Sequence, residues 1–379
     1  MDATQTDKKQ NTSQARLLTL NHIALVLVIL VIGLGALTRL LDAGLGCPDW
    51  PGCYGFLTPP EQAHHIEQAE QLFPETPVVR HQAWMEMIHR YAASFLGIIV
   101  FAVTWLTLKH GDIRPQIKMV ACVLSAVVII QAIFGMWTVT WKLWPPIVTL
   151  HLLGGFITFG LLIWLRMALH AETFTTNPES TTSSSGYLVA LRRMSLVTLA
   201  VLILQISLGA WTSSNYAGLA CPDFPTCQGQ WLDHVSVSKA LSIPTYDDLS
   251  FLHGRTDAQT RVSIQVVHRI GALITVFMMG LMILKIWNSR LRQRIGLSIL
   301  LSTLLITQVS LGVLSAVWLL PLSIALAHNL VAAMLLGSHV LAIFHLFNSA
   351  QTEEHTVKET QQLIKGKEQQ DGNFIPNNS

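Results

Sequence analysis

Eight apolar stretches of bilayer length constrain this chain more than any other feature. They lie near residues 18–38, 86–108, 118–139, 147–169, 194–214, 263–287, 295–317 and 322–347. A helix needs about 20 mostly apolar residues to cross a bilayer, so each stretch predicts one transmembrane helix. Only 12% of the 379 residues are charged, against about 25% in an ordinary soluble domain. The sequence therefore predicts an all-α integral membrane protein, and a net charge of +2 gives no case for nucleic-acid binding.

The distribution of Lys and Arg predicts the orientation. Most of the 24 basic residues fall at one end of the spans, which marks the cytoplasmic side. Eight spans return both termini to that side and leave two long loops, about residues 40–85 and 215–262, facing outward. The first apolar run has no small-residue cleavage site after it, and the N-terminal tail lacks the character of a mitochondrial transit sequence. We expect a multi-pass protein of a bacterial inner membrane with both termini cytoplasmic.

The sequence also repeats itself. Gly-Ala-Leu-Thr at 35–38 returns as Gly-Ala-Trp-Thr at 209–212, and the loop segment 43–53 returns at 217–227, both at an offset of 174. Other residues recur at offsets of 177 to 179: His89-Arg90 as His268-Arg269, Gln131 as Gln308, Gly135 as Gly312, and His151 as His328. Each repeat holds an even number of helices, so both halves have the same orientation. We predict two tandem four-helix bundles related by a pseudo-two-fold axis along the membrane normal.

This repeat divides the chain into five segments. They are a cytoplasmic tail (1–17), an N-terminal four-helix half (18–170), a cytoplasmic linker rich in Ser and Thr (171–193), a C-terminal four-helix half (194–347) and a polar tail (348–379). Low hydrophobicity predicts that the last segment is disordered.

Four of the fifteen histidines occupy equivalent places near the outer ends of the spans: His89, His151, His268 and His328. Ionisable residues inside spans are costly and usually face the bundle interior with a function or a partner. Two imidazoles from facing helices of a four-helix bundle are well suited to hold haem iron, whereas a structural zinc ion needs four close ligands. A single such histidine would favour a structural role, but four in a repeated arrangement predict a haem site in each half.

Neighbouring residues extend this hypothesis. Arg90 and Arg269 directly follow two of the histidines at the membrane interface, where they could meet haem propionates. Snorkelling of both side chains to lipid headgroups is an equal alternative. Gly154 and Gly155 follow His151 and would let a flat ring approach the backbone.

The two halves differ at one acidic position. Glu86 stands three residues before His89, and Gln265 stands three residues before His268. Residues at i and i+3 share a helix face, so we expect Glu86 beside whatever His89 binds. An acid in one of two matched sites indicates chemistry in the N-terminal half and a resident cofactor in the C-terminal half. The alternative is that Glu86 only caps a helix start, where the dipole favours an anion.

Each outer loop contains a pair of cysteines, Cys47 with Cys53 and Cys221 with Cys227. An oxidising outer compartment predicts a disulfide in each loop. Whether these pairs act in redox chemistry or only as structural staples is left open by the sequence. Metal binding is disfavoured because no third ligand lies nearby.

In combination these motifs resemble the haem A synthase family over about residues 17–347. The resemblance is carried by Thr38-Arg39, the first cysteine loop, Glu86-Met-Ile-His89-Arg90, His151, the second cysteine loop, His268-Arg269 and His328. It implies haem b held by His268 and His328, and substrate haem O handled by His89 and His151 with Glu86 alongside. It also implies oxidation of a ring methyl group to a formyl group, which gives haem A for cytochrome oxidase.

For the mechanism we expect water as the oxygen source, a proton role for Glu86 and electron transfer through haem b. The expected partners are the lipid bilayer, haem O delivered by a haem O synthase and an electron acceptor that the sequence does not identify; homo-oligomerisation is left open.

Two other functions use similar residues. A di-haem b-type cytochrome accepting electrons from quinol gives no role to the Glu86/Gln265 difference. A haem-binding transporter should have a Gly/Pro-broken helix pair at the midplane, which the sequence lacks.

Overall fold

The computed structural model describes residues 3–371 apart from 174–184, 231–234 and 290. Eight helices in this part of the chain are long and apolar enough to span a membrane, which confirms the predicted all-α membrane fold with eight spans. Two shorter helices, α2 and α7, lie in the loops between spans. The helices are α1 (Ala3–Leu40), α2 (Ala63–Leu72), α3 (Arg80–Lys109), α4 (Pro115–Thr140), α5 (Pro145–Thr173), α6 (Ser185–Ser214), α7 (Val237–Ala240), α8 (Ala258–Trp287), α9 (Arg294–Val317) and α10 (Leu322–Asp371).

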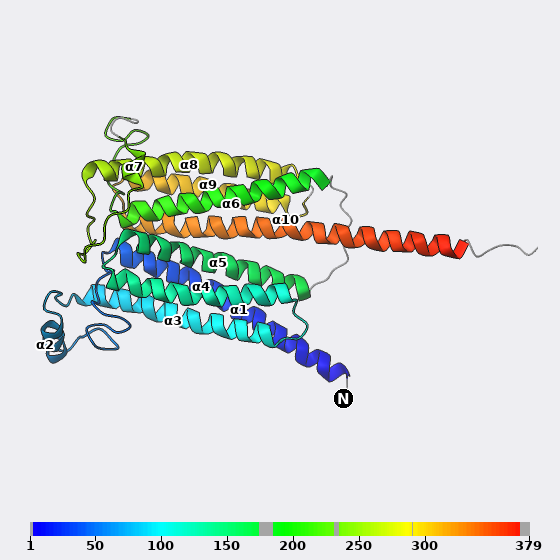
Figure 1. The fold of residues 1–379 in the computed structure, drawn as a ribbon, viewed down its shortest axis with the longest axis horizontal. Helices are drawn as coiled ribbons and strands as arrows, with labels where there is room; N and C mark the ends of the chain where they lie inside the picture. The colour runs from blue at the N-terminus through cyan, green and yellow to red at the C-terminus, as the bar shows by residue number, and fades with distance from the viewer. Residues whose placement is uncertain (1–2, 174–184, 231–234, 290, 372–379) are drawn as a thin grey trace, which may run out of the picture.

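The long helices form two groups, one of α1, α3, α4 and α5 and one of α6, α8, α9 and α10 (Figure 1). The most extensive packing is within the pairs α1–α3, α4–α5, α6–α8 and α9–α10. The groups meet where α1, α5, α6 and α10 pack together. The loops that carry α2 and α7 lie at one end of the bundle, and the start of α1 and the end of α10 lie at the other (Figure 1). Both long connections therefore share one face.

The apolar side chains of the spans are buried partly by protein and partly by lipid. Leu, Ile, Val, Phe and Ala side chains from the spans form one continuous core between the helices. Large apolar side chains remain on the outer surface of the bundle, for example Phe277 at 64% and Ile306 at 67% exposure. In water such a surface would be costly, whereas hydrocarbon accommodates it. The spans therefore need a bilayer around them.

Two helices near the candidate sites begin earlier than their apolar stretches. Helix α3 begins at Arg80 and α8 at Ala258, because intrahelical hydrogen bonding continues beyond the apolar side chains. Asp257 caps α8 by accepting a hydrogen bond from the N–H of Thr260 at 2.7 Å, a typical N-cap interaction. Glu86 consequently lies in the second turn of α3, so the proposal that it caps the helix start is wrong.

The structure also differs from the predicted tails and linker. Helix α1 already begins at Ala3, and α10 continues to Asp371 where residues from 348 onward were expected to be disordered. That segment is rich in Glu, Gln and Lys, which are good helix formers, and extending an existing helix needs no new nucleation. The ends of the predicted linker belong to α5 and α6, while residues 174–184 and 372–379 lie outside the described residues.

Unusual backbone conformations recur in both halves. Non-glycine residues with positive φ occupy matched places: Asp42 and Tyr216, Tyr54 and Gln228, Lys142 and Leu319, Leu143 and Leu320. The sequence offsets are 174 for the first two pairs and 177 for the others, as in the sequence repeat. Such φ values are uncommon outside glycine, so their recurrence agrees with the predicted duplication.

Candidate functional site

Each repeat-matched histidine lies against a glycine of the helix that packs beside it. A Cβ atom at Gly35 would lie 2.9 Å from Cε1 of His89, and one at Gly312 would lie 3.0 Å from Cε1 of His328. Only glycine allows such a close approach without displacing the ring. The same contact occurs in all four helix pairs: Gly35 with His89, Gly135 with His151, Gly209 with His268, and Gly312 with His328.

These are not the glycines singled out by the sequence. A Cβ atom at Gly154 would lie 2.4 Å from Oε1 of Gln131, so Gly154 makes room for that amide and not for a ring. The four glycines under the histidines all recur at the repeat offsets. That recurrence was the signal that could have identified them.

In the N-terminal half, the ring centroids of His89 and His151 lie 6.5 Å apart in an edge-to-face arrangement. Two imidazoles that bind one metal ion with bonds of about 2.0–2.1 Å would have centroids roughly 6–7 Å apart. The spacing therefore suits one ion between the two rings. All four histidines are also partly accessible, although they lie within apolar spans.

A backbone carbonyl lies near three of the rings, although Nδ1 of each of these rings makes no hydrogen bond among the described residues. Each carbonyl belongs to the residue one helical turn before the contacted glycine: Val31 faces His89, Gln131 faces His151, and Gln308 faces His328. A metal-ligating histidine usually donates its other ring N–H to such a group. Among the described residues, no three His, Cys, Asp or Glu side chains are grouped to hold a metal ion, which disfavours tetrahedral zinc. This donor set fits haem iron with two axial imidazoles.

Two rings have a side-chain amide beside them, and in one case Nε2 of Gln308 lies 3.2 Å from Nε2 of His328. Nε2 of Gln205 lies 3.1 Å from Nδ1 of His268 and donates to the carbonyl oxygen of the same residue at 3.1 Å. The repeat counterpart of Gln205 is Val31, which offers only its backbone carbonyl. Gln205 was not predicted from the sequence, although an amide within an apolar span is an available signal.

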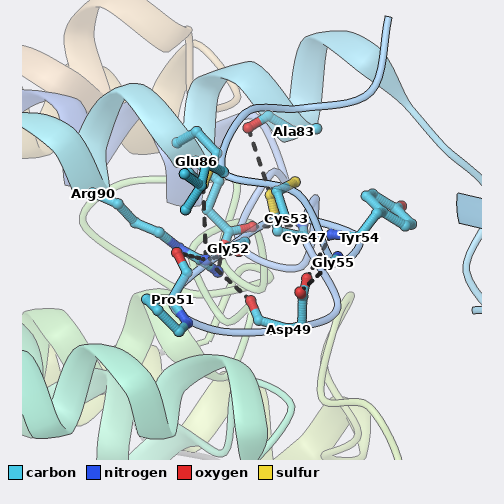
Figure 2. Close-up of a disulfide and its surroundings, with 12 residues drawn as sticks. Cys47, Asp49, Pro51, Gly52, Cys53, Tyr54, Gly55, Ala83, Glu86 and Arg90 are labelled. Atoms are coloured by element: carbon cyan, nitrogen blue, oxygen red, sulfur yellow. Dashed lines mark hydrogen bonds and ion pairs between the residues drawn. A yellow bond between two sulfur atoms is a disulfide. The ribbon is translucent and has the colours of Figure 1, made fainter. Parts of the chain in front are cut away.

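Glu86 connects α3 with the first cysteine loop. Only 4% of its surface is exposed. Its Oε2 accepts a hydrogen bond from the backbone N–H of Cys47 at 2.9 Å, and its Oε1 accepts one from Nη2 of Arg90 at 2.5 Å. Figure 2 shows the carboxylate pointing from α3 toward the disulfide loop. A charged partner and a peptide N–H therefore offset part of the cost of burying this carboxylate.

Arg90 and Arg269 attach the cysteine loops to α3 and α8. Nη1 of Arg90 donates to the carbonyl oxygen of Gly52 at 2.6 Å, as Figure 2 shows. Arg269 donates to the carbonyl oxygens of Thr226 at 2.6 Å and Cys221 at 2.8 Å. Both guanidinium groups thus have protein partners that the sequence did not reveal. Their role with haem propionates stays a prediction.

Both predicted disulfides are present, Cys47–Cys53 and Cys221–Cys227. Within the first loop, the carboxylate of Asp49 accepts hydrogen bonds from the N–H groups of Tyr54 at 2.6 Å and Gly55 at 2.8 Å (Figure 2). Asp223 makes the matching pair of bonds in the second loop. The two loops therefore share one turn structure, which their common Cys-Pro-Asp sequence encodes.

Tyr54 gives the first loop a buried phenol. Its hydroxyl donates to the carbonyl oxygen of Pro77 at 3.1 Å. Burial, and then the nearby carboxylates of Glu86, Asp49 and Glu70, raise the pKa of Tyr54 to about 12. The counterpart of Tyr54 in the second loop is Gln228, so the two loops differ in their response to alkaline pH.

The two halves contact each other through residues that are repeat counterparts. Arg39 donates to the carbonyl oxygen of Ser213, and the hydroxyl of Tyr216 donates to Asp42 at 2.8 Å. The Arg39 guanidinium also lies 3.8 Å from the centroid of the Tyr216 ring. Ser213 and Tyr216 follow Arg39 and Asp42 by 174 residues. In a two-fold arrangement, residues that contact their own counterparts lie on the axis, so this junction is where the predicted axis would pass.

Known proteins resemble the chain over both halves. The cytochrome oxidase assembly protein family matches residues 19–340. The haem A synthase of Shewanella oneidensis is 43% identical over 329 residues, covering 87% of this chain and 96% of that protein. Those of Beijerinckia indica and Flavobacterium psychrophilum are 27% and 26% identical, covering 85% and 82% of this chain and 89% and 92% of the relatives. The family match includes all four histidines and both cysteine loops, and the chain belongs to the cytochrome oxidase assembly protein family.

Proposed function

We propose that the protein is a haem A synthase, an oxidoreductase that converts a methyl group of haem O to a formyl group. One observation carries the proposal: two histidine pairs lie in matching frames, and only one has a buried carboxylate, Glu86, three residues away on the same helix. The names of the relatives support the same activity. A di-haem electron carrier would use both histidine pairs but would not need this acid.

The two halves have separate roles in this proposal. His89 and His151 bind the substrate haem O in the N-terminal half (18–170). His268 and His328 hold haem b in the C-terminal half (194–347). When bound there, haem b supplies a one-electron carrier whose potential depends on its ligands and surroundings. The four glycines allow the imidazoles to lie close to the neighbouring helices, which fixes their positions before any haem binds.

Glu86 is the proton acceptor in this scheme. Conversion of a methyl group and water to a formyl group releases protons and electrons in equal number. A positioned carboxylate can accept such protons and contribute about 10²–10⁴-fold to the rate. Arg90 and the N–H of Cys47 favour the ionised carboxylate and hold it in place. The same charge would also stabilise a cationic state of the substrate.

The proposed setting is a bacterial inner membrane with both termini cytoplasmic. The candidate sites then lie toward the outer face, beneath the disulfide loops. Haem O would arrive from a haem O synthase through the lipid phase.

Chemical identification of the haems tests the function. Protein purified from membranes should yield haem b together with haem O or haem A on chromatography. Added haem O should be converted to haem A in the presence of an electron acceptor. Haem b alone, with no conversion of added haem O, would favour the di-haem cytochrome instead.

A further inference from the structure

Two grooves flank α10 toward the end of the bundle that carries the chain termini. One, of about 200 Å³, lies between α1, α5 and α10 and is lined by residues that include Leu25, Ile163 and Arg166. The other, of about 220 Å³, lies between α5, α6 and α10 and is lined by residues that include Leu199, Val340 and Ile343. The three residues of the second groove are the repeat counterparts of those in the first. The grooves therefore occupy equivalent surfaces and differ in charge.

Arg166 is the charged member of the first groove. Its Nη1 is buried and has no hydrogen-bond partner among the described residues. No carboxylate in this part of the chain forms an ion pair with it. The residue as a whole is half-buried. A cation that is partly withdrawn from water and lacks an anionic partner favours an anionic ligand at this position. The Ser338 hydroxyl lines the same groove and can donate a hydrogen bond to that ligand.

The depth of Arg166 indicates the kind of anion. Its span ends at Ala171, five residues further on, which is about 7–8 Å along the helix axis. A long side chain at this depth reaches the headgroup level. The rest of the lining, which includes Leu25, Phe159 and Met334, is apolar and suits acyl chains. Basic pockets between transmembrane helices recognise anionic lipid headgroups.

We propose that the groove between α1, α5 and α10 binds an anionic phospholipid. Its phosphate contacts the guanidinium of Arg166 and the hydroxyl of Ser338, and its chains lie along the apolar residues from α1 and α10. The groove with Ile343 has no cation in its lining. The Arg192 guanidinium, which stacks on Phe347 at its edge, already donates to the carbonyl oxygen of Leu346, so this groove takes hydrocarbon chains without preference for the headgroup. The site lies between the halves and away from the histidine pairs, so it does not depend on the proposed activity.

Native mass spectrometry of the whole protein released from nanodiscs provides the test. With equal phosphatidylglycerol and phosphatidylcholine, the wild type should retain the anionic lipid preferentially. Arg166→Gln should lower this preference about fivefold, since one basic residue near the surface contributes about 1 kcal/mol. Arg166→Lys should keep most of it, and Ile343→Leu in the other groove is the matched control. Equal retention by the wild type and Arg166→Gln would overturn the proposal.

Two further measurements test lipid binding in this groove independently of Arg166→Gln. In case Arg166→Gln does not fold, Ile343→Arg alone should create a second preferred site and raise the number of retained anionic lipids. Failure of that variant to gain a lipid would count against the charge argument. Inorganic phosphate added in excess should not displace the lipid; displacement would show that the groove binds free phosphate. None of these readouts requires haem or turnover.

Discussion

The N-terminal and C-terminal halves have the same frame around their histidines and differ in what lies beside the first one. In each half an arginine after the histidine attaches a disulfide loop to the helix. In the N-terminal half, Glu86 lies between Arg90 and the N–H of Cys47. In the C-terminal half, Arg269 reaches Cys221 directly, and Oε1 of Gln265 has no hydrogen-bond partner among the described residues. The matched segments thus have similar backbone structure, while this position holds an acid in one half and an amide in the other.

The side chains beside the histidine rings also differ between the two halves. In the C-terminal half, the side-chain amides of Gln205 and Gln308 lie 3.1 Å and 3.2 Å from ring nitrogens of His268 and His328. In the N-terminal half, the amide of Gln131 donates to the backbone carbonyl of His151 and not to its ring. A neighbouring amide restrains the rotation of an imidazole ring. A resident cofactor must remain bound, whereas a substrate must be released as product. The firmer support in the C-terminal half agrees with that division.

The largest expected effect comes from the proposed haem ligands of the C-terminal half. We expect His268→Ala and His328→Ala each to remove most of the low-spin haem b absorbance, because loss of an axial ligand leaves the haem weakly held. His89→Ala should leave that absorbance largely intact. Reduced-minus-oxidised spectra and the ratio of haem to protein measure the effect. Equal losses in all three variants would break the proposed distinction between the halves.

The next effect concerns Glu86. Glu86→Gln makes the N-terminal half resemble the C-terminal half, so we expect haem A formation to fall at least about 10²-fold, while haem b stays bound. Extracted haem should then be haem O or a partly oxidised alcohol. Gln265→Glu is the matched control and should leave product formation unchanged. Wild-type amounts of haem A from Glu86→Gln would remove the catalytic role of this residue.

Removal of the disulfides should have a smaller effect on stability and activity, and this effect should differ between the halves. Replacing either cysteine pair by serine should destabilise the protein by at most about 2–3 kcal/mol, since each closed loop is short. Loss of Cys47–Cys53 should also lower activity, because the N–H of Cys47 holds Glu86. Loss of Cys221–Cys227 should lower only the thermal midpoint. Matching activity losses in the two double variants would contradict this difference.

The smallest effect is a response to alkaline pH. Because the folded state raises the pKa of Tyr54 from its usual 10 to about 12, the resulting stabilisation is complete below pH 10 and is lost as the pH rises to about 12. Tyr54→Phe should flatten this part of the profile of thermal midpoint against pH, at a cost of about 1 kcal/mol for the lost hydrogen bond. Gln228→Ala, at the matched position, should not alter the slope. An unchanged slope in Tyr54→Phe would show that other groups dominate.

The eight spans, the repeat and the four histidines could be recognised from the sequence alone. The reason is physical. Inside a bilayer each spanning segment must satisfy its own backbone hydrogen bonds, so a long apolar run specifies a helix without information from elsewhere in the chain. The histidines stood out because ionisable groups are rare in such runs. Helix ends were less predictable: α3 begins at Arg80 and α10 ends at Asp371, beyond the hydrocarbon limits that define a span.

Only the tertiary structure decided which side chains meet. Lipid and protein interior are similarly apolar, so the hydrophobic pattern does not show which face of a span packs against protein. For that reason the hydrogen bonds of Glu86 to Cys47 and Arg90 could not be predicted from the sequence. The contacts between Arg39 and Ser213, which are 174 residues apart, and between Gln205 and His268 likewise depend on how the helices are rotated and tilted. These properties arise from packing between distant segments, which a local sequence pattern does not encode.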